Sequence, residues 1–149
     1  MGTVPVPCGF GSRCSWSVRL VKRAGYGDGS HHQNHNTYIG VATRGTNLNV
    51  NGGFGGATAL RCSKNMGSTV WHERRSIAKA YSAKIDFGDI VTVTTDLSST
   101  QGKYKGTISF AVNGMDCGVA VDYLECQPDM WFPFVGDAYP HCELRLVDL

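Results

Sequence analysis

The sequence predicts an all-β protein folded as a sandwich of two antiparallel sheets. Short segments in which apolar and polar residues alternate recur along the chain, and no segment predicts a long helix. Nineteen glycines against five prolines, spread without a collagen-like period, indicate many turns. The length of 149 residues suits one domain, which we assign to 1–149, with 1–14 as an N-terminal extension or edge segment.

The first strand is predicted from a clear alternation of residue types. Trp16, Val18 and Leu20 share one face and Ser17 and Arg19 share the other, which is typical of a half-buried strand. All three tryptophans of the chain lie in or beside predicted strands. We therefore expect them to pack in the core: Trp16, Trp71 and Trp131.

Weaker signals follow along the first half of the chain. β-rich runs at 38–43 and 69–72 predict two short strands. Residues 22–37 and 44–56 are polar and rich in glycine, which favours surface loops. The alanines and charges of 74–84 favour a turn of helix at most.

The second half is more regular. A β-branched run at 90–95 predicts a strand, because branched side chains pack well on a pleated surface. Alternating runs at 107–112 and 115–121 flank Asn113-Gly114. This pair predicts a β-hairpin, because both positions of a type I′ turn need positive φ.

Two further strands are predicted at 131–135 and 142–146. In the last strand Leu144 and Leu146 should face inward together with Cys142. Glu143 and Arg145 alternate with them and should face outward: the strand is expected to be half-buried.

Composition excludes several classes of function. The 14 Lys and Arg residues against 12 Asp and Glu give a formal charge of +2, without the strong basic bias of a nucleic-acid binder. No apolar run approaches the roughly 20 residues needed to span a bilayer, and the first residues lack the basic and apolar regions of a signal peptide. We therefore expect a cytoplasmic protein that binds neither nucleic acid nor membrane.

The six cysteines lie at positions 8, 14, 62, 117, 126 and 142, with no Cys-x-x-Cys pair. Their spacing does not fit a zinc ribbon. An even number permits a disulfide framework, but a chain of this length can bury a core without such bonds. Thiols in a reducing compartment are therefore the favoured interpretation.

No set of residues predicts catalysis. The three glutamates are not paired with another acid at the spacing of a glycosidase, and neither a nucleophile elbow nor a phosphate loop is present. His31, His32 and His35 could present imidazoles to a metal, although a solvated loop is the simpler interpretation. Asp89 and Asp96 bracket a strand and are expected in turns rather than as calcium ligands. We expect no enzyme activity and no cofactor.

The predicted strands also resemble those of a known family. The words Phe87-Gly88-Asp89-Ile90-Val91-Thr92-Val93, Gly106-Thr107-Ile108-Ser109-Phe110 and Gly118-Val119-Ala120, with Asp96 and Asn113-Gly114 between them, are similar in order and spacing to the core signature of the SPRY domain. Trp16-Ser17-Val18, Tyr38-Ile39-Gly40-Val41-Ala42 and Trp131-Phe132-Pro133-Phe134-Val135 resemble its other strands. The resemblance implies a concanavalin-like jelly roll, a β-sandwich of two antiparallel sheets.

Within this family, residues 138–144 look most like the last strand of SPRY proteins that also carry a SOCS box. Those proteins use the SPRY domain to capture a peptide for a ubiquitin ligase. The positions that match their peptide pocket imply a partner-binding site made of Ala138, Tyr139, Pro140, Gly53, Phe54, Asn34 and His35. Tyr139 keeps the aromatic character of the family's tryptophan, and no SOCS box is present.

The resemblance implies a non-catalytic module that binds a short peptide or loop of a protein partner. It would act in substrate recognition for a ubiquitin ligase or within a larger signalling protein, as a monomer or as part of a larger chain. We expect the loops at 22–37, 44–56 and 136–141 to meet at one end of the sandwich and form the cleft. The alternative is a lectin-like carbohydrate-binding domain, because lectins share the curved-sandwich architecture.

Overall fold

A computed structural model describes residues 13–22, 37–43, 57–63, 68–72, 75–81, 84–100, 103–125, 131–137 and 142–147 of the chain. Every regular element in these ranges is a β-strand, which confirms the predicted all-β class. The strands are β1 (Arg13–Lys22), β2 (Thr37–Thr43), β3 (Ala57–Cys62), β4 (Ser68–His72), β5 (Arg75–Tyr81), β6 (Ile90–Thr100), β7 (Lys103–Val112), β8 (Met115–Glu125), β9 (Trp131–Asp137) and β10 (Cys142–Val147).

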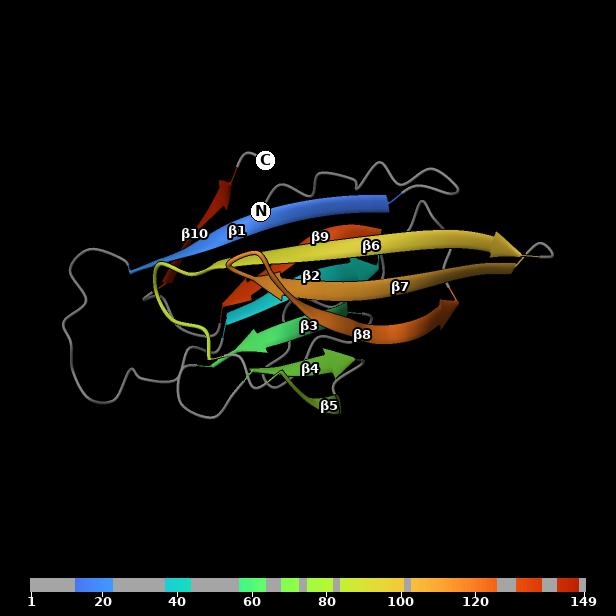
Figure 1. The fold of residues 1–149 in the computed structure, drawn as a ribbon, viewed down its shortest axis with the longest axis horizontal. Coiled ribbons are helices and arrows are strands. Elements are labelled where there is room, and N and C mark those ends of the chain that lie inside the picture. Colours follow the sequence, from blue (N-terminus) through green and yellow to red (C-terminus); the bar gives the residue numbers. More distant parts are fainter. Residues whose placement is uncertain are drawn as a thin grey trace.

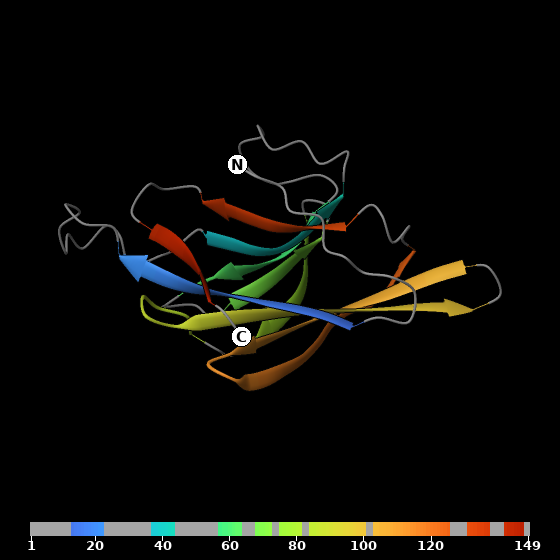
Figure 2. The same ribbon diagram turned by 90° about the horizontal axis from the view of Figure 1, so that it is seen from above.

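The strands form two five-stranded antiparallel sheets. The first sheet has the order β10-β1-β6-β7-β8 and the second the order β5-β4-β3-β2-β9. The two layers overlap in Figure 1 and are separated in Figure 2, where the first sheet lies below the second. The predicted sandwich of two antiparallel sheets is therefore confirmed. Within the described ranges, no helix is long and apolar enough to cross a bilayer.

The core fills the space between the sheets, and neighbouring residues of a strand alternate between this core and the outer face. Trp16 and Leu144 pack against this core, as predicted for both. Burying each large apolar side chain contributes about 1.5–3 kcal/mol to folding. The buried members are Val18, Leu20, Val91, Val93, Ile108, Phe110 and Val112 of the first sheet, Ile39, Val41, Leu60, Cys62 and Val70 of the second, and Ile85 between β5 and β6.

On the outer face of the first sheet, β1 and β6 are joined by pairs of hydroxyl groups. The hydroxyls of Ser15 and Thr94 are 2.8 Å apart, and those of Ser17 and Thr92 are 2.7 Å apart. The alternation of β1 predicts this polar face, because Ser17 and Arg19 oppose the core residues. Hydroxyl pairs of this kind are the cross-strand contacts that stabilise one face of a sheet.

The outer face of the second sheet holds a small cluster around Gly40. Buried Ala42, Ala57, Ala59 and Phe134 form this cluster. A Cβ atom at Gly40 would collide with the backbone of β3, which approaches too closely for any side chain. The glycine is therefore required by the close packing of β2 against β3.

The predicted hairpin between β7 and β8 is confirmed. Asn113 and Gly114 have φ of 51° and 80°, as a type I′ turn requires. The Asn113 side chain also accepts a hydrogen bond from the Ile90 amide (2.9 Å) and donates one to Asp89 Oδ1 (2.9 Å). Asp89 Oδ2 accepts from the Asp86 amide (2.8 Å), so Asp89 has the turn role that the sequence predicts.

β8 is an edge strand and is irregular. Its pairing with β7 shifts register at several points, and Gly118 has a positive φ of 89°. Asp116 Oδ1 accepts a hydrogen bond from the Gly118 amide (2.8 Å) and closes a local turn. Bulges of this kind discourage pairing with another sheet edge.

The structure corrects several expectations. Asp96 does not lie in a turn: it is within β6, opposite Arg13 of β1 and Thr107 of β7. The helical turn expected near 74–84 is wrong, because β5 pairs with β4 and this pairing overrides the local propensity. Leu146 does not face a buried core: it is 78% exposed at the outermost strand of the first sheet. Trp71 lies half-buried on the outer face of the second sheet, edge-to-face with Tyr38 at 6.4 Å between ring centroids. The side chain of Trp131 lies outside the described part.

Candidate functional site

The partner-binding residues expected from the sequence lie outside the described residues. This holds for all seven, Ala138, Tyr139, Pro140, Gly53, Phe54, Asn34 and His35, and for the neighbouring His31 and His32. What the structure does describe is the strand ends from which their segments leave. The site is therefore built from those ends and from the surface beside them.

Two of the segments leave the sandwich at the same end. Lys22, the last residue of β1, lies opposite Cys142, the first residue of β10. Thr37, the first residue of β2, lies opposite Asp137, the last residue of β9. The segments that follow β1 and β9 therefore start and finish at two register pairs, one in each sheet, at the same end of the sandwich, on the left in Figure 1. This end is called the β1–β9 end below.

The third segment does not leave from this end. Residues 44–56 follow Thr43 and precede Ala57, which pairs with Ala42 at the opposite end of β2. The seven residues of β2 span roughly 20 Å at ~3.3 Å per residue. The expectation that all three loops leave from one end is wrong for 44–56, because a single strand carries its preceding and following loops at opposite ends.

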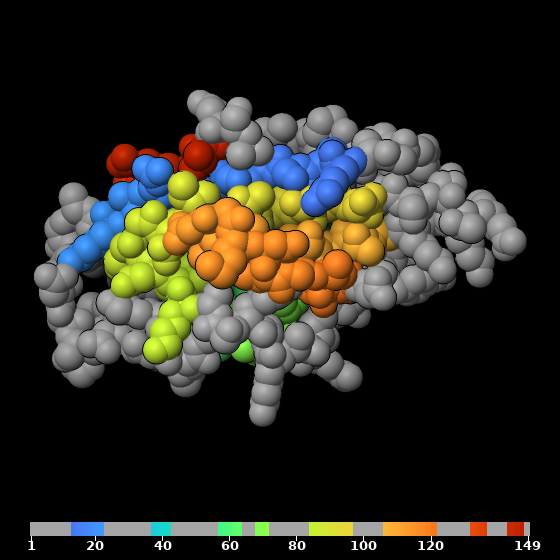
Figure 3. Space-filling model, in the orientation of Figure 1, coloured from blue at the N-terminus to red at the C-terminus, as the bar shows by residue number. Residues whose placement is uncertain are grey.

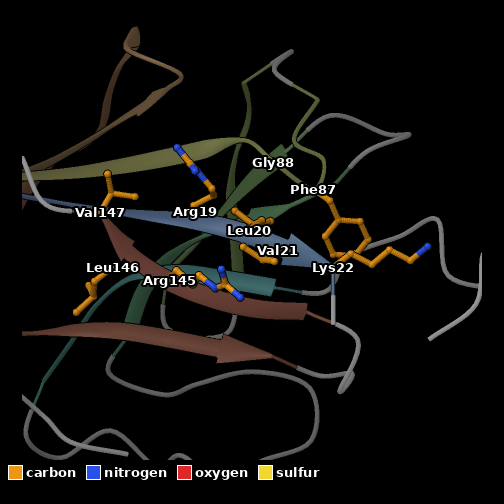
Figure 4. Close-up of a pocket in the computed structure, with 9 residues that line it drawn as sticks. All are labelled: Arg19, Leu20, Val21, Lys22, Phe87, Gly88, Arg145, Leu146 and Val147. Atoms are coloured by element: carbon orange, nitrogen blue, oxygen red, sulfur yellow. The ribbon is translucent and has the colours of Figure 1, made fainter. Parts of the chain in front are cut away.

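A shallow pocket of ≈ 640 Å³ reaches the β1–β9 end on the first sheet. It lies where β1 and the edge strand β10 run side by side (Figure 3), next to the turn at 86–89. Figure 4 shows the residues that line it. They are Arg19, Leu20, Val21 and Lys22 of β1, Phe87 and Gly88 of the turn, and Arg145, Leu146 and Val147 of β10.

The turn is fixed to β1 by backbone hydrogen bonds. The Gly88 amide donates to the Leu20 carbonyl (2.7 Å), and the Leu20 amide donates to the Asp89 carbonyl (3.0 Å). Gly88 has φ of 95°, a conformation that favours glycine. These bonds hold Phe87, which packs partly against the core, beside the end of β1.

The pocket is cationic. Arg19 and Arg145 lie directly opposite each other in register, and Lys22 is exposed at the end of β1. Arg145 Nε donates to Glu143 Oε1 at 2.8 Å, and this neighbour raises the pKa of the Arg145 guanidinium. Within the described residues, no hydrogen bond or ion pair engages the Arg19 guanidinium. Like charges directly opposite each other across a strand pair destabilise a sheet.

These groups can bind an anion beside an apolar group. The described residues that line the pocket are cationic or apolar apart from Gly88. Guanidinium groups present forked N–H donors that match a carboxylate. Phe87 and the exposed Leu146 supply apolar surface next to them.

Sequence reasoning missed this pocket. Arg19 and Arg145 were each assigned to an outward face, but the sequence carries no signal that their strands are neighbours. Leu146 was assigned to the core because its alternation matches that of Leu144. The sequence indicates two outward-facing arginines on separate strands. Only the strand register shows that they lie opposite each other.

The described residues contain no group of three or more histidine, cysteine and acidic side chains that could hold a metal. Cys14, Cys62 and Cys117 carry thiols rather than disulfides. Burial raises the pKa of the Cys117 thiol; a backbone hydrogen bond at Val112 opposes this shift and the charge of Asp116 adds to it. A raised pKa leaves less thiolate at neutral pH and makes a weak nucleophile.

Comparison with known proteins adds no relative: no protein-family model matches the chain, and no curated protein matches its sequence.

Proposed function

We propose that this chain is a non-catalytic protein-interaction domain of the SPRY type, which binds a short peptide or loop of a partner at the β1–β9 end. The observation that carries the proposal is the pair of register contacts Lys22–Cys142 and Thr37–Asp137. They place the strand ends that flank 23–36 and 138–141 at the same end of the sandwich.

This arrangement suits peptide capture for a physical reason. Loops anchored on rigid antiparallel strands lose little conformational freedom on binding, so more of the contact energy appears as affinity. The segment 138–141 bridges the two sheets between Asp137 and Cys142. In the proposal Tyr139 is the aromatic anchor, with Ala138, Pro140, Asn34 and His35 around it.

Gly53 and Phe54 are not part of the partner site in this proposal. Their segment is anchored at the opposite end of β2, beside Thr43 and Ala57. The proposal therefore confines the partner site to the segments at 23–36 and 138–141. Captured partners would be substrates for a ubiquitin ligase, or targets of a larger signalling protein that contains this domain; the same binding step serves both.

The test starts from a peptide selected against the immobilised chain from a display library. Its affinity for the wild type, Tyr139→Ala and Val119→Ala is then measured by fluorescence polarisation. Val119 is 58% exposed on β8, the edge of the first sheet opposite β10, and serves as the control. We expect Tyr139→Ala to weaken binding about tenfold or more, as for an aromatic hot spot, and Val119→Ala to leave it unchanged. Equal affinity of all three proteins would refute the site.

A further inference from the structure

We propose that the pocket between β1, β10 and the turn at 86–89 binds an acidic stretch of the partner segment. Its carboxylates would pair with Arg19 and Arg145, and apolar side chains on either side of them would lie against Phe87 and Leu146. This inference rests on the proposed function, because it names the chemistry of the captured segment. Figure 4 shows Arg19 of β1 and Arg145 of β10 on neighbouring strands, with Phe87 on one side of them and Leu146 on the other.

The first argument is the arginine pair itself. Arg19 and Arg145 face each other across the β1–β10 pairing, where the Cβ atoms of directly opposed residues are about 4.5–5.5 Å apart. Like charges at directly opposed positions of a strand pair are unfavourable in the free protein. A carboxylate between them removes the repulsion and gains two charge-assisted contacts.

The second argument is the number of donors left for a ligand. Glu143 engages only Nε of Arg145, at 2.8 Å, and leaves the terminal nitrogens of that guanidinium without a partner among the described residues. The Arg19 side chain has no such partner at all within the described residues. A guanidinium has five N–H donors, so both arginines keep the forked geometry that a carboxylate fits.

The third argument concerns the apolar part of the site. Leu146 is 78% exposed, although its position in the alternation of β10 belongs to the core face. It lies next to Val147 in the pocket lining, on the opposite side of the pocket from Phe87. Acidic and apolar residues that alternate along a peptide would match this mixture of cations and apolar groups.

A peptide fits these observations better than a polyanion. The whole chain carries a formal charge of only +2, which gives weak long-range attraction for nucleic acid or an anionic membrane. Glu143 is paired with Arg145, so this arginine is already partly neutralised and the pocket does not match a dense array of phosphates. Local pairing with one or two carboxylates does not need a large basic surface.

The direct probe is a fluorescein-labelled peptide, Gly-Ser-Glu-Leu-Glu-Leu-Glu-Ser-Gly, compared with the same peptide carrying Gln in place of Glu. We expect the acidic peptide to bind at least about fivefold more tightly, and its affinity to fall between about 50 and about 500 mM NaCl. Equal affinity of the two peptides would overturn the proposal. Tighter binding of inorganic phosphate, a single-stranded oligonucleotide or anionic vesicles with the same arginine dependence would also overturn it.

Variants locate the site. Arg19→Ser and Arg145→Ser should each weaken binding of the acidic peptide about two- to fivefold, as loss of one exposed ion pair does, and the double variant about tenfold. Arg13→Ser is the matched control, because Arg13 is an exposed arginine on β1 at the opposite end, in register with Asp96. An equal effect of Arg13→Ser would show non-specific attraction and contradict the assignment.

The same variants separate this inference from the proposed function. A library-selected peptide that loses affinity with Tyr139→Ala but not with Arg19→Ser or Arg145→Ser would leave the interaction domain standing and refute the acidic pocket. Arginine-dependent binding of the acidic peptide, together with Tyr139→Ala equal to wild type on library-selected peptides, would confirm the pocket and refute the loop site. Thermal unfolding of each variant checks that it is folded.

Discussion

At Gly40 the second sheet has no room for a side chain, because a Cβ atom there would meet the Thr58 carbonyl oxygen and Cα of Ala59. Both are backbone atoms, so a side chain at this position fits only if β3 moves away from β2. We expect Gly40→Ala to lower the free energy of unfolding by about 1–3 kcal/mol, measured by urea denaturation. Ser109→Ala, on the outer face of β7, is the control. Unchanged stability of Gly40→Ala would mean that β2 and β3 are not this close.

Thr37 is completely buried, and its hydroxyl has no hydrogen-bond partner among the described residues. An unsatisfied buried hydroxyl is costly, so Thr37→Val should raise the free energy of unfolding by about 1 kcal/mol. Thr92→Val is the matched control: the Thr92 hydroxyl bonds to that of Ser17, and its loss should lower stability by about 0.5–1.5 kcal/mol. A loss of stability in Thr37→Val would show that a water satisfies the hydroxyl.

Cys117 gives a prediction on pH dependence. Its thiol pKa is raised above the usual value, mainly by burial. The thiolate is the reactive form, so alkylation by iodoacetamide should be slower than for a cysteine in an unstructured peptide. The rate should also go on rising at pH values where that of the peptide has levelled off. Mass spectrometry follows both reactions, and coincident pH profiles would contradict the burial.

At the scale of elements, Asn113 joins the hairpin to the turn at 86–89. It combines a φ of 51° with side-chain hydrogen bonds to Ile90 and Asp89. We expect Asn113→Ala to cost about 2 kcal/mol in the free energy of unfolding, from the left-handed backbone and the lost bonds together. Asn113→Gly keeps the backbone conformation and should cost about half as much. Equal losses would mean that the backbone conformation carries no strain.

The elements show which features are readable in a sequence. The hairpin at Asn113-Gly114 was predictable because the requirement for positive φ is met by adjacent residues. The exposure of Leu146 was not predictable from the sequence, because its alternation with Arg145 is that of an ordinary half-buried strand. Leu146 is exposed because β10 lies at the edge of the sheet. The pairing of β5 with β4 was also not predictable, because the residues of β5 have a local preference for helix.

For the whole molecule, alternation and turn residues were enough to predict a sandwich of two antiparallel sheets. They did not reveal which strands are neighbours, and the Arg19–Arg145 pair depends on that. The position of 44–56 was within reach of the sequence, because a strand at 38–43 separates it from 22–37. The remaining site residues rest on a family resemblance, so their role as a partner site is a proposal.

The measurement that tests the central claim most directly is amide chemical-shift mapping of a library-selected peptide on the labelled wild-type chain. Binding at the β1–β9 end predicts the largest shifts at Lys22, Thr37, Asp137 and Cys142, the residues that anchor the two segments. Largest shifts at the opposite end, where Arg13 pairs with Asp96, would contradict the account.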